Sequence, residues 1–317
     1  MNIIHPSVEY WQQANTLDGI WEHAARCARV CYQSEPINRN ESAKDFLLRT
    51  IAKNGFKDKS SHMSVLEHST IYLYLTDNHH YITGKNYNKN AEDITNKYIN
   101  NTYSKVYIHA MLRDYYITTN LRVIIENDWI DDLEYIVNPY SYHIKRYTFS
   151  IITNIGVSRE LNRHRCHSIS EESTRYCNYS KDKFNNGLTF IIPEWLDLEE
   201  GNVKDYGRSV ITGKNQLHIN GKPCDIVDFD DNLTCEGEWL LSNNKAEYHY
   251  LRLLSKGWKP QQAREVLPLS LKTQVVHTAF EDDWKDFIAL RSDGISGAPH
   301  PNIKGIADKV KHLIELV

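Results

Sequence analysis

The densest group of side chains able to do chemistry lies between residues 159 and 175. Its candidate binding residues are Arg159, Glu160, Arg163, His164, Arg165, Glu171, Ser173, Thr174 and Arg175. The planar guanidinium of arginine binds phosphates and the carbonyl edges of heterocycles. Donors this concentrated favour an anionic ligand such as a nucleotide. Taken alone, the stretch is explained equally well as a solvated charged face, with its arginines paired to Glu171 and Glu172.

A second polar group precedes a predicted strand and consists of His62-Met63-Ser64-Val65-Leu66-Glu67-His68. Two histidines and a carboxylate suggest a metal site, but their spacing matches no standard zinc pattern. A polar turn that binds a cofactor or another chain is the better interpretation. We therefore expect no metal site here.

Two isolated arginines, Arg264 and Arg291, stand among apolar residues. A cation in such surroundings needs an anionic partner, and an ordinary ion pair within the chain explains each one considered alone. No cysteine stands where a helix start would clearly lower its pKa, and no GxSxG, GxGxxG or P-loop motif occurs. The sequence therefore contains neither a conventional nucleophile nor a Rossmann turn.

The composition narrows the class of protein. A net charge of −4 argues against a broad nucleic-acid-binding surface, so any anion site must be local. No apolar run approaches the roughly 18 residues of a membrane span, and the first residues do not resemble a secretory signal. We expect a cytoplasmic protein that binds neither membrane nor nucleic acid.

Periodicity indicates the elements that must position these groups. It predicts helices over residues 17–33, 40–52, 156–166, 246–254 and 303–317, with another beginning at 261. Aromatic and β-branched runs predict strands over residues 69–76, 146–152 and 188–192. Residues 78–143 are predicted to be irregular apart from a helical stretch at 118–126, and residues 197–235 to form an acidic surface insertion. Mixed elements without βαβ regularity predict an α+β fold, which we treat as one domain over residues 1–317.

The predicted helix over residues 156–166 would organise the first group. On such a helix Glu160, Arg163 and His164 would share one face with His167, because residues three and four apart are neighbours on a helix surface.

Together these groups resemble the flavin-dependent thymidylate synthases, the ThyX family. The family's motif is Arg-His-Arg, seven residues, then Ser, which here is Arg163-His164-Arg165 and Ser173. The continuation to Ser180, the group at residues 62–68, residues 257–271 and Leu290-Arg291 are also similar to longer members. Four blocks in the same order cover most of the chain, which is far more specific than the Arg-His-Arg motif alone.

The resemblance implies a fold, a reaction and an assembly. The fold would be an antiparallel sheet packed with long helices, in a homotetramer whose active sites combine residues of several subunits. FAD would be reduced by NADPH, and methylenetetrahydrofolate would supply the carbon that converts dUMP to dTMP. No enzyme cysteine is needed as the nucleophile in this reaction.

The resemblance also assigns roles to residues. The FAD-binding residues would be His62, Ser64, Glu67, Arg163, His164, Arg165 and Cys166. The residues at the nucleotide would be Arg159, Glu160, Glu171, Ser173, Thr174, Arg175, Arg264 and Arg291. Arg291 and Ser173 are the expected catalytic residues, with Arg291 against the uracil, where a fixed cation stabilises developing charge. Arg175 and Arg264 suit the phosphate.

Several positions depart from the family pattern. Ser170-Glu171 replaces Asn-Glu, and Glu160 stands where some members have glutamine. Residues 278–282 lack an asparagine and an arginine that are expected near the flavin, so no role is transferred to them.

Two alternatives follow from these observations. Glu160 could favour an exocyclic amine, which suggests a related hydroxymethylase acting on dUMP or dCMP. A non-enzymatic alternative is a nucleic-acid-binding protein that uses residues 159–175 as its basic patch, although the net charge and the lack of a known module argue against it.

Overall fold

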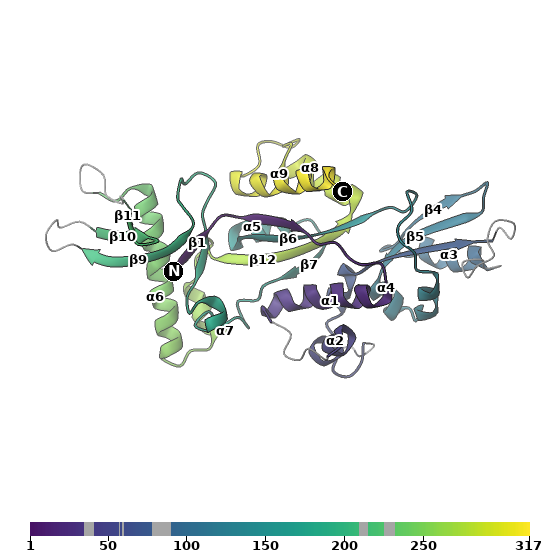
Figure 1. Cartoon of the computed structure of the whole chain (residues 1–317), viewed down its shortest axis with the longest axis horizontal. Coiled ribbons are helices and arrows are strands. Elements are labelled where there is room, and N and C mark those ends of the chain that lie inside the picture. Colours follow the sequence, from purple (N-terminus) through teal and green to yellow (C-terminus); the bar gives the residue numbers. More distant parts are fainter. Residues whose placement is uncertain (35–40, 57, 59, 78–89, 209–214, 225–231) are drawn as a thin grey trace.

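The computed structural model describes residues 1–34, 41–56, 58, 60–77, 90–208, 215–224 and 232–317. The molecule is elongated, with a four-stranded central sheet between helices, a five-stranded sheet toward one end and a three-stranded sheet toward the other (Figure 1). Mixed helices and mainly antiparallel sheets confirm the predicted α+β class. No helix in these residues is long and apolar enough to cross a membrane.

The central sheet is fully antiparallel. Its strands, in spatial order, are β2 (Ser7–Tyr10), β6 (Arg146–Asn154), β12 (Lys272–Phe280) and β7 (Ser168–Glu171). One face packs against α5 (Ile155–Leu161), α8 (Glu281–Arg291) and α9 (Pro301–Glu315), while α1 (Leu17–Tyr32) covers the other (Figure 1). Strand alternation explains the difference between the faces: Phe149 and Ile151 enter the α8–α9 core, whereas Thr148 and Ser150 face α1.

The sheet at one end is formed largely by the segment predicted to be irregular. It consists of β3 (Thr70–Thr76), β5 (Asp114–Asn120) and β4 (Lys105–His109). Around it lie α3 (Ala91–Ile99), α4 (Leu121–Glu126) and the 3₁₀ helices η1 (Met63–His68) and η2 (Ile130–Tyr135). The helix α2 (Ala43–Ile51) packs against α1 and contributes to the same hydrophobic core. The prediction for residues 90–143 was therefore wrong outside α4, because Tyr115 and Ile117 alternate into a shared core. Residues 78–89 lie outside the described part.

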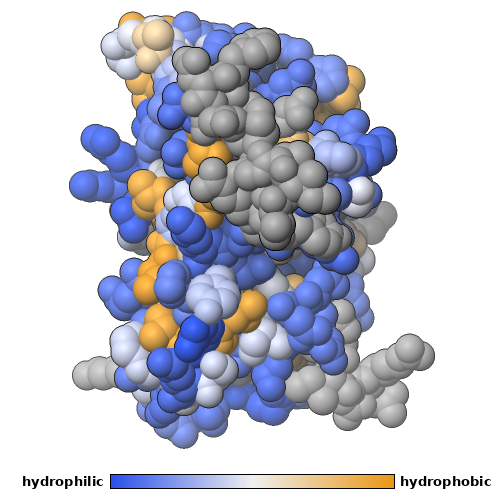
Figure 2. Space-filling model, turned by 90° about the vertical axis from the view of Figure 1, so that its left-hand side faces the viewer, coloured by the Kyte–Doolittle hydropathy of each residue, from blue (hydrophilic) through white to orange (hydrophobic). Residues whose placement is uncertain are grey.

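The sheet at the other end includes strands from the second predicted insertion. Its order is β11 (Lys222–Cys224), β10 (Asn215–Ile219), β9 (Gly201–Arg208), β1 (Asn2–Ile4) and β8 (Thr189–Ile191). The strands within residues 197–235 thus extend a sheet and bury Val203 and Leu217; residues 209–214 and 225–231 lie outside the described part. Two helices, α6 (Cys235–Ser255) and α7 (Pro260–Ala263), with the 3₁₀ helices η3 (Asp182–Phe184) and η4 (Arg264–Val266), complete this end. Its visible surface is mostly hydrophilic, with small apolar patches (Figure 2).

Some of the predicted helices are confirmed, and others have different bounds in the structure. Those over residues 17–33, 40–52 and 303–317 are confirmed as α1, α2 and α9, and α6 is longer than predicted; residue 40 lies outside the described part. The helix predicted to continue to Cys166 is wrong, because α5 ends at Leu161 and the chain turns before entering β7 at Ser168. Backbone hydrogen bonds from His164 to Leu161 and from His167 to His164 form that turn.

Candidate active site

The Arg163-His164-Arg165 motif occupies the turn between α5 and β7, so the predicted shared helix face does not exist. Arg163, Arg165 and Cys166 are exposed, whereas His164 is half-buried. In the described part of the chain, neither Arg163 nor Arg165 forms an ion pair, and the same holds for the exposed Arg159 and Arg175. Four cations close in sequence therefore remain available to anions from outside the chain.

Arg291, at the end of α8, meets two of the residues predicted to accompany it. Its Nη1 lies 3.1 Å from Glu160 Oε2, and its Nε donates to His164 Nε2 at 3.3 Å. Glu160 comes from α5 and His164 from the following turn, so the end of α8 packs beside both segments. We call Arg291, Glu160 and His164 the Arg291 cluster.

The contact with Arg291 defines the state of the His164 ring. Burial, together with the charges of Arg291 and Arg163, lowers the pKa of His164 to about 4. The ring is therefore neutral near pH 7, with Nε2 as the acceptor and the proton on Nδ1. The ring also packs edge-on against Phe287 at a centroid distance of 4.9 Å, which fixes its orientation.

The predicted nucleotide segment lies where β7 ends. The backbone N–H of Ser173 donates to the Cys31 carbonyl at 3.0 Å, which ties the segment to the end of α1. The backbone N–H of Arg175 donates to Ser173 Oγ at 3.3 Å. Arg264, in η4, donates from Nη1 to Thr174 Oγ1 at 3.3 Å and lies 3.9 Å from Glu265. Thr174 and Arg264, predicted from distant parts of the sequence, are thus in contact, and we call them the Thr174–Arg264 pair.

The interpretation of this stretch as a self-paired charged face is wrong. Glu171 accepts from Asn162 Nδ2 and Thr273 Oγ1, each at 3.1 Å. Glu172 is buried and forms an ion pair with Lys272 at 2.6 Å. Because both carboxylates have other partners, they do not neutralise the arginines of the motif.

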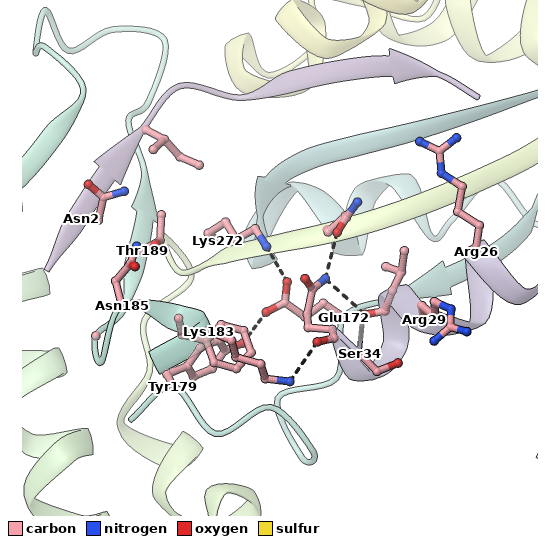
Figure 3. Close-up of a pocket in the computed structure, with 16 residues that line it drawn as sticks. Asn2, Arg26, Arg29, Ser34, Glu172, Tyr179, Lys183, Asn185, Thr189 and Lys272 are labelled. Carbon is pink, nitrogen blue, oxygen red and sulfur yellow. Dashed lines mark hydrogen bonds and ion pairs between the residues drawn. The ribbon is translucent and has the colours of Figure 1, made fainter. Parts of the chain in front are cut away.

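Beside this segment lies a pocket of about 410 Å³ that the sequence did not predict (Figure 3). Lys272 and Tyr179 point toward Glu172, and the Tyr179 hydroxyl donates to its carboxylate at 2.9 Å. The cations among the described lining residues are Arg26, Arg29, Lys183 and Lys272, against the single carboxylate of Glu172. These residues come from α1, the loop around η3 and β12, so no local sequence signal could have grouped them.

The His62–His68 segment forms η1 and packs against the same sheet. His62 and Ser64 are exposed, whereas Glu67 forms an ion pair with Arg122 at 2.5 Å, a partner that the sequence did not reveal. His68 is fully buried, with Nδ1 at 2.8 Å from Thr278 Oγ1 and Nε2 at 2.9 Å from Ser170 Oγ. The described residues contain no group of three or more histidine, cysteine or carboxylate side chains able to hold a metal ion.

The predicted site residues therefore fall into separate groups within one chain. The Arg291 cluster, the Thr174–Arg264 pair and the η1 residues each have internal or neighbouring contacts. No hydrogen bond or ion pair between residues of the described ranges joins the Arg291 cluster to the Thr174–Arg264 pair.

A family model matches this chain and shows which family it belongs to. Residues 143–317 match the family model of the thymidylate synthase complementing protein, which is more than half of the chain. The chain belongs to this family. The match includes the Arg-His-Arg turn, Ser173, Arg264 and Arg291, so the ThyX resemblance of these motifs is confirmed. It begins just before β6 and leaves out η1 and the β3–β5–β4 sheet.

One curated relative of the ThyX family is the flavin-dependent thymidylate synthase of Kosmotoga olearia. It is 30% identical over 158 residues, which cover 49% of this chain and 57% of the relative. The match thus spans little more than half the length of that protein.

Two solved structures of the UMP/dUMP methylase PolB from Streptomyces cacaoi are distantly similar. The structure bound with 5-Br UMP has 22% sequence identity and a TM-score of 0.37, covering 53% of this chain and 68% of that chain. The structure bound with 5-Br dUMP has 15% identity and a TM-score of 0.40, covering 99% of this chain and 92% of that chain. At such low TM-scores these likenesses assign neither a ligand nor a geometry to this chain.

Proposed function

We propose that this protein is a flavin-dependent thymidylate synthase that converts dUMP to dTMP, with methylenetetrahydrofolate as carbon donor and NADPH as reductant. Family membership supports the reaction class. The main structural support for the proposal is the Arg291 cluster. A guanidinium held by a carboxylate and a neutral imidazole is a fixed donor with a defined direction. Such a group suits the carbonyl oxygens of a uracil ring.

The donor set also fits FAD. Arg163 and Arg165 are exposed arginines without a carboxylate partner in the described part of the chain, which suits the diphosphate of a dinucleotide. His62 and Ser64 add exposed polar groups, whereas Glu67 is already bound to Arg122. We therefore assign FAD binding to the turn residues, including Cys166, and to His62 and Ser64. Glu67 would act by holding Arg122. When bound, the flavin would supply the hydride chemistry that the side chains cannot.

The chain's own residues would bind and orient dUMP. Arg175 and the Thr174–Arg264 pair would take the phosphate, because their donors have only hydroxyl or weak ionic partners here. Arg291 would lie against the pyrimidine and stabilise negative charge developing on its carbonyl oxygens. Ser173 and Glu171 would complete the nucleotide contacts from the end of β7. No step requires a thiol nucleophile.

We further propose a homotetramer with shared active sites. In the described part of the chain no hydrogen bond or ion pair joins the Arg291 cluster to the Thr174–Arg264 pair, which is compatible with a site whose two parts come from different subunits. Residues from neighbouring subunits would then complete each site.

Glu160 supports one alternative, a related hydroxymethylase that acts on dUMP or dCMP. Its carboxylate accepts from Arg291 and could also accept from the N3–H of uracil or the amine of cytosine. The two bases therefore need to be compared directly.

A binding experiment tests the proposal at the level of cofactor and substrate. Protein purified with added FAD should be yellow, and titration with dUMP should perturb the spectrum of the bound flavin, whereas dCMP should not. Protein that stays colourless with excess FAD would overturn the flavoenzyme proposal. A spectral response to dCMP but not to dUMP would indicate that dCMP is the substrate.

A further inference from the structure

A buried arginine outside the proposed active site lacks a counter-charge. Arg146 begins β6 and is 8% exposed. Its Nη1 donates to Thr70 Oγ1 at 3.3 Å, and its guanidinium lies 5.3 Å from the centroid of the Phe280 ring. Its Nε has no hydrogen-bond partner, and no carboxylate in the described ranges forms an ion pair with it.

This arrangement is unfavourable without an anion. A buried cation costs several kcal/mol unless it is paired and hydrogen-bonded, and a hydroxyl and an aromatic face offset only part of that cost. Burial lowers the pKa of Arg146 to about 10, so the group is still charged near pH 7. Glu67 and Asp283 act on it only from beyond ion-pair distance, and Glu67 is already paired with Arg122.

Arg146 lines a pocket whose cationic and polar side chains suit an anion, the partner that Arg146 lacks. The pocket has a volume of about 140 Å³ and is also lined by Lys145, Gln12, Thr148 and Val317, the last residue of the sequence. No Asp or Glu side chain is among its described lining residues, and the terminal carboxylate forms no ion pair with Arg146 or Lys145. Lys145, like Arg146, has no ion pair among the described residues. Because one water occupies about 30 Å³, the volume accommodates a tetrahedral oxyanion with some of its hydration. The charged groups of Arg146 and Lys145 and the side-chain amide of Gln12 thus line a space of the right size.

We propose that this pocket is a binding site for a phosphate-sized oxyanion, held by Arg146 and Lys145. The Arg146 guanidinium supplies its charge and the remaining N–H donors of its terminal nitrogens, and the Lys145 ammonium supplies a second charge at the half-buried rim. The bound group is either inorganic phosphate or the phosphoryl group of a nucleotide. None of its ligands belongs to the proposed FAD or dUMP site, so the inference does not depend on that function.

Thermal unfolding with phosphate as the probe tests the site. At matched ionic strength, phosphate should raise the Tm of the wild-type protein above its value in chloride, because a ligand that binds only the folded state stabilises it. The shift should be lost in Arg146→Met and Lys145→Gln and kept in Lys256→Gln, a control at the exposed end of α6. In chloride, Arg146→Met should be at least as stable as the wild type, because it removes an unpaired buried cation. An equal shift in all four proteins, or none in the wild type, would overturn the proposal.

Calorimetric titration keeps the test decisive if Arg146→Met does not fold. Lys145→Gln should bind inorganic phosphate at least tenfold more weakly than the wild type, with Lys256→Gln unchanged. Titration with AMP identifies the source: tighter binding than phosphate, lost in Lys145→Gln, indicates a nucleotide phosphoryl group, and weaker binding indicates the free ion. Equal phosphate affinity in Lys145→Gln and Lys256→Gln would contradict the site. Flavin content, measured in the same samples, should not change, which separates this result from any failure of the proposed enzyme.

Discussion

Arg291 is held from two sides by groups of different character. Glu160 provides a full counter-charge at 3.1 Å, and the neutral His164 ring provides an acceptor at 3.3 Å. The carboxylate keeps the half-buried guanidinium in place before any ligand arrives, and the imidazole directs its plane. A preorganised cation of this kind does not have to reorient when charge develops on a substrate.

Replacing Arg291 with alanine should lower turnover of dUMP by about 100- to 1,000-fold, as loss of one preorganised donor does in other active sites. Flavin content should fall far less than turnover, because His164 is the one predicted FAD contact that Arg291 touches among the described residues. The matched control is Arg252→Ala, in which an exposed arginine of α6 loses only its bond to Tyr248. Equal loss of flavin and of turnover in Arg291→Ala would contradict the assigned role.

Replacing His62 with alanine should weaken FAD binding by about tenfold, the value of one hydrogen bond to an anionic or strongly polar group. His62 is exposed and precedes η1, so the change should not disturb the core. Fluorescence titration of the released flavin measures the affinity, with the exposed His312→Ala as control. An unchanged affinity would remove His62 from the cofactor site.

At the scale of elements, a polar layer joins α1 and η1 to the central sheet. His23 contacts Thr148 at 3.2 Å, Thr148 contacts Thr278 at 2.7 Å, and Thr278 contacts His68 at 2.8 Å. His68 then contacts Ser170 in β7, directly before the nucleotide segment. Each group is buried and has a partner, so the layer specifies one arrangement of α1 over the strands. The position of residues 171–175 therefore depends on this buried contact.

The Glu172–Lys272 ion pair ties the end of β7 to the start of β12 and gives a stability prediction. Lys272→Met should destabilise the protein by about 3–5 kcal/mol, because it leaves a buried carboxylate without its cation. The double variant Glu172→Gln/Lys272→Met should regain most of that loss, since the glutamine still accepts from Tyr179. Urea unfolding of the single and double variants measures both values. A double variant no more stable than Lys272→Met would contradict the pairing.

His167 gives a pH prediction. It is 7% exposed, and burial is the first cause that lowers its pKa to about 3 from the ordinary 6.5. The unfolded chain takes up this proton near pH 6.5 and the folded chain does not. The neutral ring's contribution is therefore complete above pH 6.5 and is lost as the pH falls toward 3.

His167→Gln should reduce the fall in unfolding free energy between pH 6.5 and 5 by up to about 1.4 kcal/mol per pH unit. The measurement is urea unfolding at several pH values, in which only the slope against pH is compared. Identical slopes for variant and wild type would contradict the neutral buried ring.

At the scale of the whole molecule, the proposed shared site predicts complementation between subunits. Arg291→Ala and Arg264→Ala, each nearly inactive alone, should regain activity when co-expressed, because mixed tetramers contain some sites with both arginines intact. Arg291→Ala mixed with Glu160→Ala should regain none, since those two residues belong to one cluster of one chain. Light scattering should give a mass of four 37.0 kDa chains. A monomer, or no recovery in the first mixture, would contradict the shared site.

Local patterns in the sequence suffice for one helix and for the family motif, but not for contacts formed by tertiary packing. The amphipathic spacing of residues 17–33 identifies α1, and the Arg-His-Arg spacing to Ser173 identifies the ThyX motif. The end of α5 at Leu161 was missed, because the following residues are compatible with a helix and only the need to enter β7 turns the chain. The partners Arg122 and Lys272 were missed because they are brought to Glu67 and Glu172 by tertiary packing.

Identification of the nucleotide product tests the central claim most directly. The purified protein with FAD, NADPH and methylenetetrahydrofolate is incubated separately with dUMP and dCMP, and the products are identified by mass spectrometry. We predict dTMP from dUMP, no product from dCMP, and no product when FAD or methylenetetrahydrofolate is omitted. Formation of only a hydroxymethylated nucleotide, or of a product only from dCMP, would contradict the assignment as a thymidylate synthase.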